Sequence, residues 1–283
     1  MRALKEQLVQ LGYLARCTHD RFLGDTRRAV LALQRDCGLE ADGLVGPGTR
    51  EAIEGLLKAA KDGNTAEPAD GLDLVPDTLP AALRAAIGTA LAGVDEVRVR
   101  VVRRALAHAV EAEGTAPPLC FYIRGANLYD TDLSLHAMTE KRLKAYFHKA
   151  AYRQYFDGGR QEMMAARARE AGYAIPGADC SGMVVGLWRA EGLVKPGFDA
   201  CADSLFSRYC TAVESPEPGD LCWRKGHIGL YVGGGYVAEC LGGAYGLVLT
   251  RLAKRRARSR VDGSLHSFSA WQGYGRPKCY GGR

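Results

Sequence analysis

Apolar residues recur at helical spacing in the first sixty residues of the chain. Leu4, Leu8 and Leu11 fall on one face of a predicted helix. Thr26 and Thr49 are expected to cap a second and a third helix, because a threonine side chain can accept a hydrogen bond from a free helical N–H. The apolar positions of those two helices are Val30, Leu33, Cys37, Ile53, Leu56 and Leu57. The pattern predicts a small helical unit.

A repeated turn precedes the second and third predicted helices. Asp20-Arg-Phe-Leu-Gly24 is followed by Thr26, and Asp42-Gly-Leu-Val-Gly46 is followed by Thr49. A repeat of this kind indicates a duplicated helical module.

The remaining chain predicts a linker and a larger second domain. Residues 63–77 are polar and rich in Asp, Gly and Pro, as linkers are. Residues 78–113 and 138–172 follow helical patterns, and residues 119–127 predict a short strand that ends in a turn. Three tyrosines of the second helical stretch alternate with Lys and Arg; we favour a solvated face with buried rings over a polymer-binding stripe. The expected boundaries are therefore 1–62, 63–77 and 78–283.

Strict alternation of apolar and other residues begins at His227. Ile228, Leu230 and Val232 fall on one face of a predicted strand, and His227 falls on the other. Three consecutive glycines, 233–235, predict a hairpin, and the return strand 236–240 carries Glu239. An odd loop centred on residue 233 or 234 puts His227 and Glu239 on one face, whereas a two-residue loop puts them on opposite faces. The odd loop would set a carboxylate beside the imidazole.

Cys180 stands where a helix is expected to begin. Asp179 occupies the N-cap position, and Val184, Leu187 and Trp188 follow at helical spacing. Unpaired N–H groups and the macrodipole at a helix N-terminus favour a thiolate over a thiol. A cysteine before an apolar helix is nevertheless often inert core, so this segment alone leaves both interpretations open.

Composition and charge exclude several classes of protein. The 283 residues are 47% hydrophobic and 25% charged, which excludes a disordered chain, a collagen and a coiled-coil rod. The net charge of 38 − 32 = +6 is too small to indicate nucleic acid, and we expect the basic run Lys254–Arg260 to be a solvated loop. The nine cysteines contain no Cys-x-x-Cys pair, so we expect reduced thiols, no metal site and no other cofactor. No apolar run approaches the ~18 residues of a membrane span, and the first residues do not resemble a signal peptide.

The N-terminal sequence resembles the peptidoglycan-binding module of cell-wall enzymes, the PG_binding_1 type. The resemblance rests on the Leu4–Leu14 opening, the Arg27–Gln34 helix, Gly38-Leu39 and Asp42–Pro47 with Thr49. It covers residues 1 to about 60 and implies a three-helix fold that docks on glycan or stem peptide. A plain helical bundle without a ligand is the alternative.

Three segments of the second domain resemble the NlpC/P60 family of papain-like cysteine peptidases. They are Asp179-Cys-Ser-Gly182, Pro218-Gly-Asp-Leu221 and His227–Gly233, in the family's order. The resemblance spans residues 178–250 and implies an α+β fold in which a helix that carries the cysteine packs on an antiparallel sheet. The run after Gly243 is similar to versions in bacteriophage lysins.

The resemblance assigns roles to six residues. Cys180 is the expected nucleophile, His227 the base and Glu239 the third polar residue, where the family more often has His, Asn or Gln. Tyr122, in a turn motif that here reads Tyr-Ile-Arg-Gly-Ala, is an expected substrate or oxyanion contact. The expected substrate-binding residues are Tyr122, Asp179 and Ser181; helix capping is the alternative for the last two.

The expected protein is an endolysin-like peptidoglycan hydrolase that cuts the stem peptide between D-glutamate and the diamino acid. An N-acetylmuramoyl-L-alanine amidase, an acyltransferase or deamidase with the same chemistry, and an inactive wall-binding protein are the alternatives. We expect synthesis in the bacterial cytoplasm, release by a separate pore, and action on the wall of the host of a phage or prophage. The sequence leaves the oligomeric state open.

Overall fold

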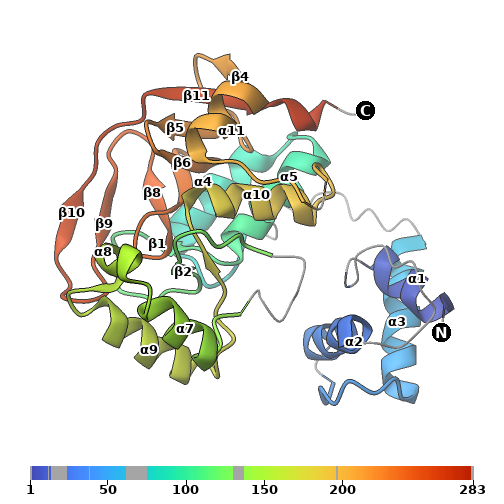
Figure 1. Cartoon of the computed structure of the whole chain (residues 1–283). Helices are drawn as coiled ribbons and strands as arrows, with labels where there is room; N and C mark the ends of the chain where they lie inside the picture. The colour runs from blue at the N-terminus through green and yellow to red at the C-terminus, as the bar shows by residue number, and fades with distance from the viewer. Residues whose placement is uncertain are drawn as a thin grey trace. The chain divides into compact units, whose positions relative to one another are not determined.

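The computed structural model describes residues 2–11, 13, 24–37, 39–61, 75–129, 137–195 and 197–281. The chain divides into two compact units, Met1–Pro68 and Ala69–Arg283, which are described separately (Figure 1). Most of the expected linker, residues 63–74, lies outside the described residues, as do residues 20–23 of the first repeated turn. None of the helices in the described ranges has both the length and the apolar character that a membrane crossing needs.

The first unit is helical throughout its described elements: α1 (Arg2–Gln10), α2 (Gly24–Asp36) and α3 (Pro47–Lys61). Four apolar positions predicted from helical spacing, Leu8, Val30, Leu33 and Ile53, are buried in one core together with Ala29, and Leu4, Leu11, Cys37 and Leu57 pack against it. A buried amide closes the turn between α2 and α3, since Gln34 Nε2 donates to Asp42 Oδ1 at 2.9 Å and Gly43 N donates to Gln34 Oε1 at 2.9 Å. Gly43 has φ +75°, a left-handed conformation that favours glycine.

The prediction that Thr26 and Thr49 are helix caps is wrong. Both lie inside the first turn of their helices and are buried, because α2 begins at Gly24 and α3 begins at Pro47. Proline is favoured at the first helical position, where no N–H is needed, and this moves the start of α3 ahead of Thr49. The hydroxyl of Thr49 instead accepts a hydrogen bond from Gln34 Nε2 at 3.1 Å.

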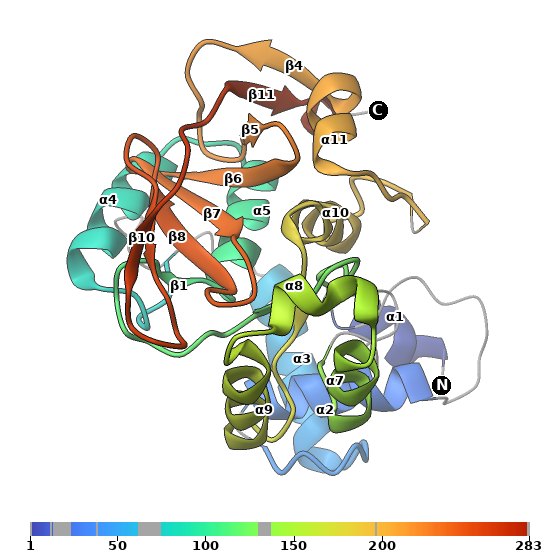
Figure 2. The same cartoon turned by 60° about the vertical axis from the view of Figure 1, so that its left-hand side comes forward.

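The second unit is α+β and is built on a mixed seven-stranded sheet (Figure 2). The strand order is β1-β8-β7-β6-β5-β11-β4, with β1 parallel to β8 and the other neighbours antiparallel. The strands of the sheet are β1 (Val110–Glu111), β4 (Cys210–Val213), β5 (Leu221–Arg224), β6 (His227–Gly233), β7 (Tyr236–Cys240), β8 (Leu247–Arg251) and β11 (Gly273–Pro277). The pair β9 (Arg256–Arg258) and β10 (Leu265–Ser267) forms a separate ribbon.

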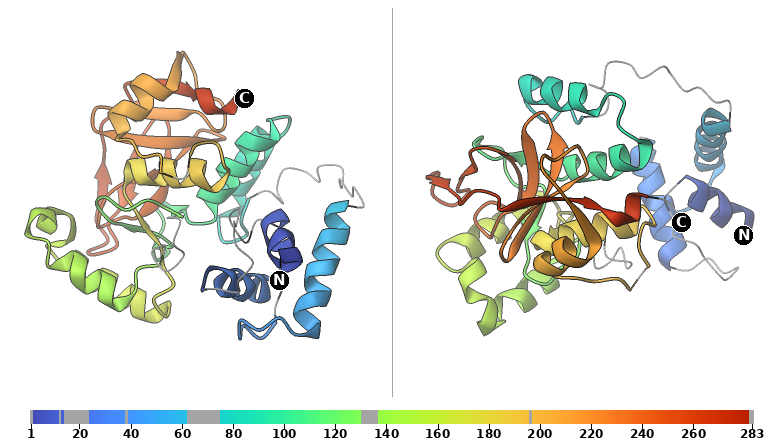
Figure 3. Two further views of the ribbon diagram at one scale, coloured as in Figure 1. Left: turned by 45° about the vertical axis from the view of Figure 1, so that its right-hand side comes forward. Right: turned by 90° about the horizontal axis from the view of Figure 1, so that it is seen from above.

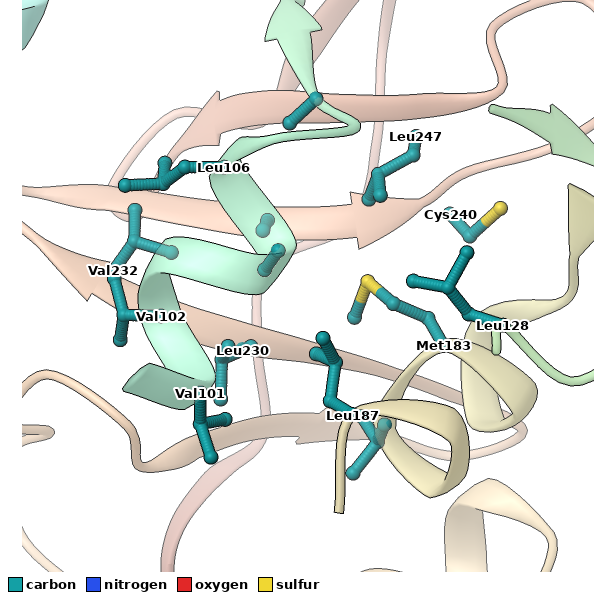
Figure 4. Close-up of a cluster of buried hydrophobic side chains, with 14 of the residues drawn as sticks. Val101, Val102, Leu106, Leu128, Met183, Leu187, Leu230, Val232, Cys240 and Leu247 are labelled. Carbon is teal, nitrogen blue, oxygen red and sulfur yellow. The ribbon is translucent and has the colours of Figure 1, made fainter. Parts of the chain in front are cut away.

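Helices α4 (Ala81–Leu91), α5 (Glu96–Leu106) and α10 (Cys180–Ala190) pack on the sheet and share its main core. Figure 4 shows Val101 and Leu106 of α5 and Leu187 of α10 turned toward the same strands. Leu230 and Val232 of β6 enter this core, as the alternation predicts. The expected helical stretch 78–113 is thus correct for α4 and α5, but its end is wrong, because Val110–Glu111 is the edge strand β1.

A second helical group stands beside the sheet in Figure 3 and has its own core. It consists of α7 (Glu140–Phe147), η2 (Ala150–Tyr152), α8 (Arg153–Phe156) and α9 (Arg160–Glu170). Tyr146 is buried there, and Tyr152 packs against the same cluster, as the favoured interpretation predicts. The remaining described elements are β2 (Phe121–Tyr122), β3 (Gly177–Ala178), α11 (Ala202–Tyr209) and η3 (Lys278–Tyr280).

The segment Pro218–Leu221 anchors the sheet to α5. Asp220 is fully buried, and Arg98 of α5 donates to its Oδ1 at 2.9 Å and to the Pro218 carbonyl at 2.7 Å. Gly219 has φ +94° and supplies the tight turn. This motif therefore stabilises the fold and fixes the start of β5.

The prediction of a solvated loop at Lys254–Arg260 is wrong. Arg255 is 3% exposed, and β9 follows it directly. Arg256 donates to the Glu113 carboxylate, while Arg258 and Arg260 donate to backbone carbonyls of residues 111–114 and 263. Guanidinium groups bind carbonyl and carboxylate oxygens strongly, so these arginines tie the β9–β10 ribbon to the rest of the unit.

Candidate functional site

Cys180 is the first residue of α10, as predicted. Asp179 caps the helix, because its Oδ1 accepts a hydrogen bond from Gly182 N at 2.8 Å. The first N–H groups of a helix have no helical partner, and the positive end of the helix dipole lies there. The sulfur of Cys180 is therefore held where negative charge is favoured.

Two glycines of α10 let a neighbouring segment approach the helix closely. A Cβ on Gly182 would lie 1.9 Å from the Ala126 carbonyl oxygen, and one on Gly186 would lie 1.7 Å from that of Leu128. Leu128 N donates to the Gly182 carbonyl at 3.0 Å. Segment 126–128 is thereby locked against α10 next to Cys180, which fixes the direction of the helix N-terminus.

The β6–β7 hairpin brings His227 and Glu239 to one face, as the odd loop predicts. The turn itself has only two residues between the paired Gly233 and Tyr236, but the register shifts between Tyr231 and Gly233. This irregularity adds one residue to β6. The extra residue has the same effect as an odd loop, so His227 and Glu239 lie on the same face. His227 Nε2 lies 2.7 Å from Glu239 Oε2.

Glu239 is fully buried and bound on both oxygens. Thr250 Oγ1 donates to its Oε1, Arg255 Nε donates to the same oxygen at 3.1 Å, and Arg255 Nη2 donates to Oε2. Burial disfavours its charge, yet the hydrogen bonds and charges of His227 and Arg255 prevail and lower the pKa of Glu239 to about 2. The carboxylate is therefore ionised at neutral pH.

His227 contacts Cys180 and Glu239 at once. Burial lowers its pKa, but hydrogen bonds to Cys180 and Glu239, together with their negative charge, raise the pKa of His227 to about 9. Nε2 of His227 pairs with Glu239, so Nδ1 is the ring nitrogen left to interact with Cys180. Cys180, His227, Glu239 and Arg255 thus form one buried series, in which His227 and Arg255 both pair with the Glu239 carboxylate and make its burial tolerable.

Arg255 and Trp271 belong to this site and were missed by sequence reasoning. The sequence pattern places Arg255 in a basic run that predicts a solvated loop, and Trp271 carries no local sequence signal. The Trp271 ring stacks on His227 at 5.7 Å between centroids with an interplanar angle of 11°. The guanidinium of Arg255 lies 4.0 Å from the centre of the same ring. Trp271 therefore shields the buried charges from water.

The predicted substrate-binding residues Tyr122, Asp179 and Ser181 lie close to Cys180. Tyr122 of β2 pairs in parallel with Ala178, and burial, with the negative charge of Cys180 nearby, raises the pKa of Tyr122. Both oxygens of Asp179 are used internally, since Gly125 N donates to Oδ2 at 2.8 Å and Ser181 Oγ to Oδ1 at 3.0 Å. Contact of these three side chains with substrate stays a prediction.

A cavity lies beside the imidazole of His227. Cys180 is 5% exposed, whereas the side chain of His227 is 15% exposed and borders a cavity of about 300 Å³. Among the residues that the structure describes, no group of three or more His, Cys, Asp or Glu side chains is arranged to hold a metal ion. The described cysteines are all free thiols.

Comparison with protein families finds a match at the N-terminus. The family model described as "Putative peptidoglycan binding domain" matches residues 1–53. The search of curated proteins and the search of solved structures found no match. The family match supports a cell-wall-binding module at the N-terminus, with peptidoglycan as its partner.

Proposed function

We propose that the protein is a peptidoglycan hydrolase in which Cys180 attacks an amide bond of the stem peptide. The observation that carries this proposal is the series Cys180–His227–Glu239, in which His227 lies beside Cys180 at the N-terminus of α10 and pairs with the buried carboxylate of Glu239. A nucleophile, a base and a group that orients the base are the parts of a cysteine peptidase site. An NlpC/P60-like papain fold would explain why these parts meet at one helix end and one hairpin.

In the first step the Cys180 sulfur bonds to the carbonyl carbon of the substrate. The carbonyl oxygen becomes negative and would accept a hydrogen bond from the backbone N–H of Cys180 at the start of α10. The C–N bond then breaks as His227 gives its proton to the departing amine. A thioester remains on Cys180.

In the second step water attacks the thioester carbon. Neutral His227 accepts the proton of the water, the C–S bond breaks, and Cys180 leaves as the thiolate. His227 is again an imidazolium, and the product is a carboxylic acid. Glu239 stays ionised throughout and stabilises the imidazolium, while Arg255 balances its charge.

The bond between D-glutamate and the diamino acid is the substrate bond that we propose, on the resemblance to NlpC/P60 peptidases. The N-terminal module would hold the enzyme on the wall polymer, which raises the local concentration of that bond. On this account the protein acts at the cell wall, as an endolysin does.

The test is digestion of purified walls followed by mass spectrometry of the soluble products. Wild-type protein should lower turbidity and release fragments cut inside the stem peptide, and Cys180→Ala should release none while it stays folded. Fragments that consist of glycan freed from intact stems would identify an amidase instead. Lysis by Cys180→Ala at the wild-type rate would remove Cys180 from the mechanism.

A second experiment separates wall binding from catalysis. Cys180→Ala, which keeps the module intact, should sediment with insoluble peptidoglycan. Replacement of the buried Gln34, whose amide closes the turn between α2 and α3, by Ala should weaken this cosedimentation through loss of the module fold. Equal cosedimentation of the two variants would show that the module does not depend on this turn for binding.

A further inference from the structure

The cavity of about 300 Å³ beside His227 is lined mainly by basic and hydroxyl-bearing side chains. It is bounded by the end of β5, the start of β6 and the chain from β10 to residue 269. The lining residues are Arg224, His227, Leu241, Arg255, Ser267, Phe268 and Ser269. No acidic residue is among the described residues that line it. Such a lining suits an anionic group.

Among the charged residues of this lining, Arg224 has a hydrogen-bond donor, Nε, without a partner among the described residues. Arg224 and His227 are directly opposed in the β5–β6 ladder, so their side chains lie on the same face of the sheet. Arg224 Nε is buried and has no hydrogen-bond partner among the described residues. Buried donors are rarely left unpaired in native proteins, and an unpaired one calls for a ligand or water. Arg255 differs, because Glu239 neutralises it.

The proposed mechanism indicates which part of the substrate would occupy the cavity. In the proposed mechanism His227 delivers a proton to the departing amine, so the residue that leaves must lie over His227. The cavity borders the same ring. A group bound in the cavity therefore belongs to the residue on the amine side of the cleaved bond.

We propose that this cavity is a carboxylate subsite, in which Arg224 binds the free carboxylate of the diamino acid that leaves. The proposal rests on the function proposed above and adds the substrate chemistry that the site selects. The planar guanidinium can bind a carboxylate through two parallel hydrogen bonds. Ser267 and Ser269 supply hydroxyl donors, and the ring of Phe268 supplies an apolar wall for the carbon chain. The enzyme should therefore distinguish stem peptides with a free carboxylate from those in which that group is amidated.

The experiment uses two synthetic stem peptides that are identical except for a carboxylate or a carboxamide on the diamino acid. Their dissociation constants are measured by calorimetry with full-length Cys180→Ala, which cannot consume them, and kcat and KM are measured with the wild-type enzyme. We expect the carboxylate peptide to bind roughly tenfold or more tightly. The same preference should be seen in kcat/KM, mainly through KM.

Arg224→Ala should abolish the preference by weakening binding of the carboxylate peptide alone, and Arg224→Lys should restore part of it. The matched control is Arg208→Ala, which removes an exposed arginine of α11 and should leave the preference unchanged. Equal binding of the two peptides by Cys180→Ala, or a full preference in Arg224→Ala, would overturn the proposal. Cleavage without preference would refute this subsite alone, whereas selective binding without cleavage by the wild-type protein would refute the proposed function alone.

Discussion

Glu239→Gln tests the electrostatics of the site, because it removes one charge and keeps the size of the side chain. Glutamine retains an acceptor for His227 but no longer stabilises the imidazolium by its charge. The change should therefore lower the pKa of His227 from about 9. Loss of the imidazolium leaves the departing amine without a proton donor, so the alkaline limb of the rate profile should move to lower pH.

The structure sets the size of this effect. A rise of the pKa of His227 from 6.5 to about 9 corresponds to about 3 kcal/mol in favour of the imidazolium. Cys180 and Glu239 share this stabilisation, so loss of the Glu239 charge should remove about 1–2 kcal/mol of it. The alkaline limb should then lie about one pH unit lower in Glu239→Gln than in the wild type.

The assay is the rate of hydrolysis of a soluble stem peptide between pH 6 and pH 10.5, with the position of the limb as the readout. Glu239→Gln also leaves Arg255 buried without its counter-charge, which costs about 3–5 kcal/mol of stability. The control for this loss is Glu191→Gln, since Glu191 is a second buried carboxylate that pairs with Arg100 and Arg104. Glu191→Gln should destabilise the fold and leave the limb near pH 9. A limb that stays near pH 9 in Glu239→Gln would refute the role assigned to its charge.

Three further predictions concern the thiol, the helix contact and pH. Cys201 is an exposed thiol whose pKa is lowered by a hydrogen bond to a neighbouring serine, so the labelling experiment uses a Cys201→Ser background. In that background iodoacetamide should label Cys180 ahead of the other cysteines. Uniform labelling in peptide mass maps would contradict this. Gly182→Ala should cost at least about 2 kcal/mol in denaturant unfolding, because its methyl group collides with the Ala126 carbonyl; an unchanged midpoint would count against the close packing. The raised pKa of His227 contributes stability that is complete below pH 6.5 and lost as pH rises through about 9. The free energy of unfolding should therefore fall by up to about 3 kcal/mol from pH 7 to pH 10 in the wild type, and less in His227→Gln.

Local sequence patterns predicted the parts of the site that depend on local structure. The N-cap at Asp179 placed Cys180 at a helix start, and alternation put His227 on the face opposite the core. The three glycines could not decide whether His227 and Glu239 share a face of the hairpin. They are compatible both with a two-residue turn, which separates the two side chains, and with an odd loop, which does not. The irregularity between Tyr231 and Gly233 settles it, and such an extra residue has no sequence marker besides glycine.

Tertiary contacts decided the parts that sequence reasoning missed. Arg255 looks like one of several arginines in a basic run, and only its contact with the buried Glu239 separates it from them. This contact also accounts for the burial of a carboxylate at position 239, since Arg255 supplies the opposite charge. Trp271 reaches His227 from a distant part of the chain, and Val110 joins β8 by a parallel pairing that no local pattern predicts.

The central claim is that the Cys180 sulfur bonds covalently to the substrate. The most direct measurement is mass spectrometry of protein mixed with excess stem peptide and quenched in acid within milliseconds to seconds. The account predicts a thioester adduct on the peptide that contains Cys180, with the mass of the acyl part of the substrate, and none in Cys180→Ala. Rapid hydrolysis with an unmodified Cys180 at every quench time, and undiminished hydrolysis by Cys180→Ala, would contradict it.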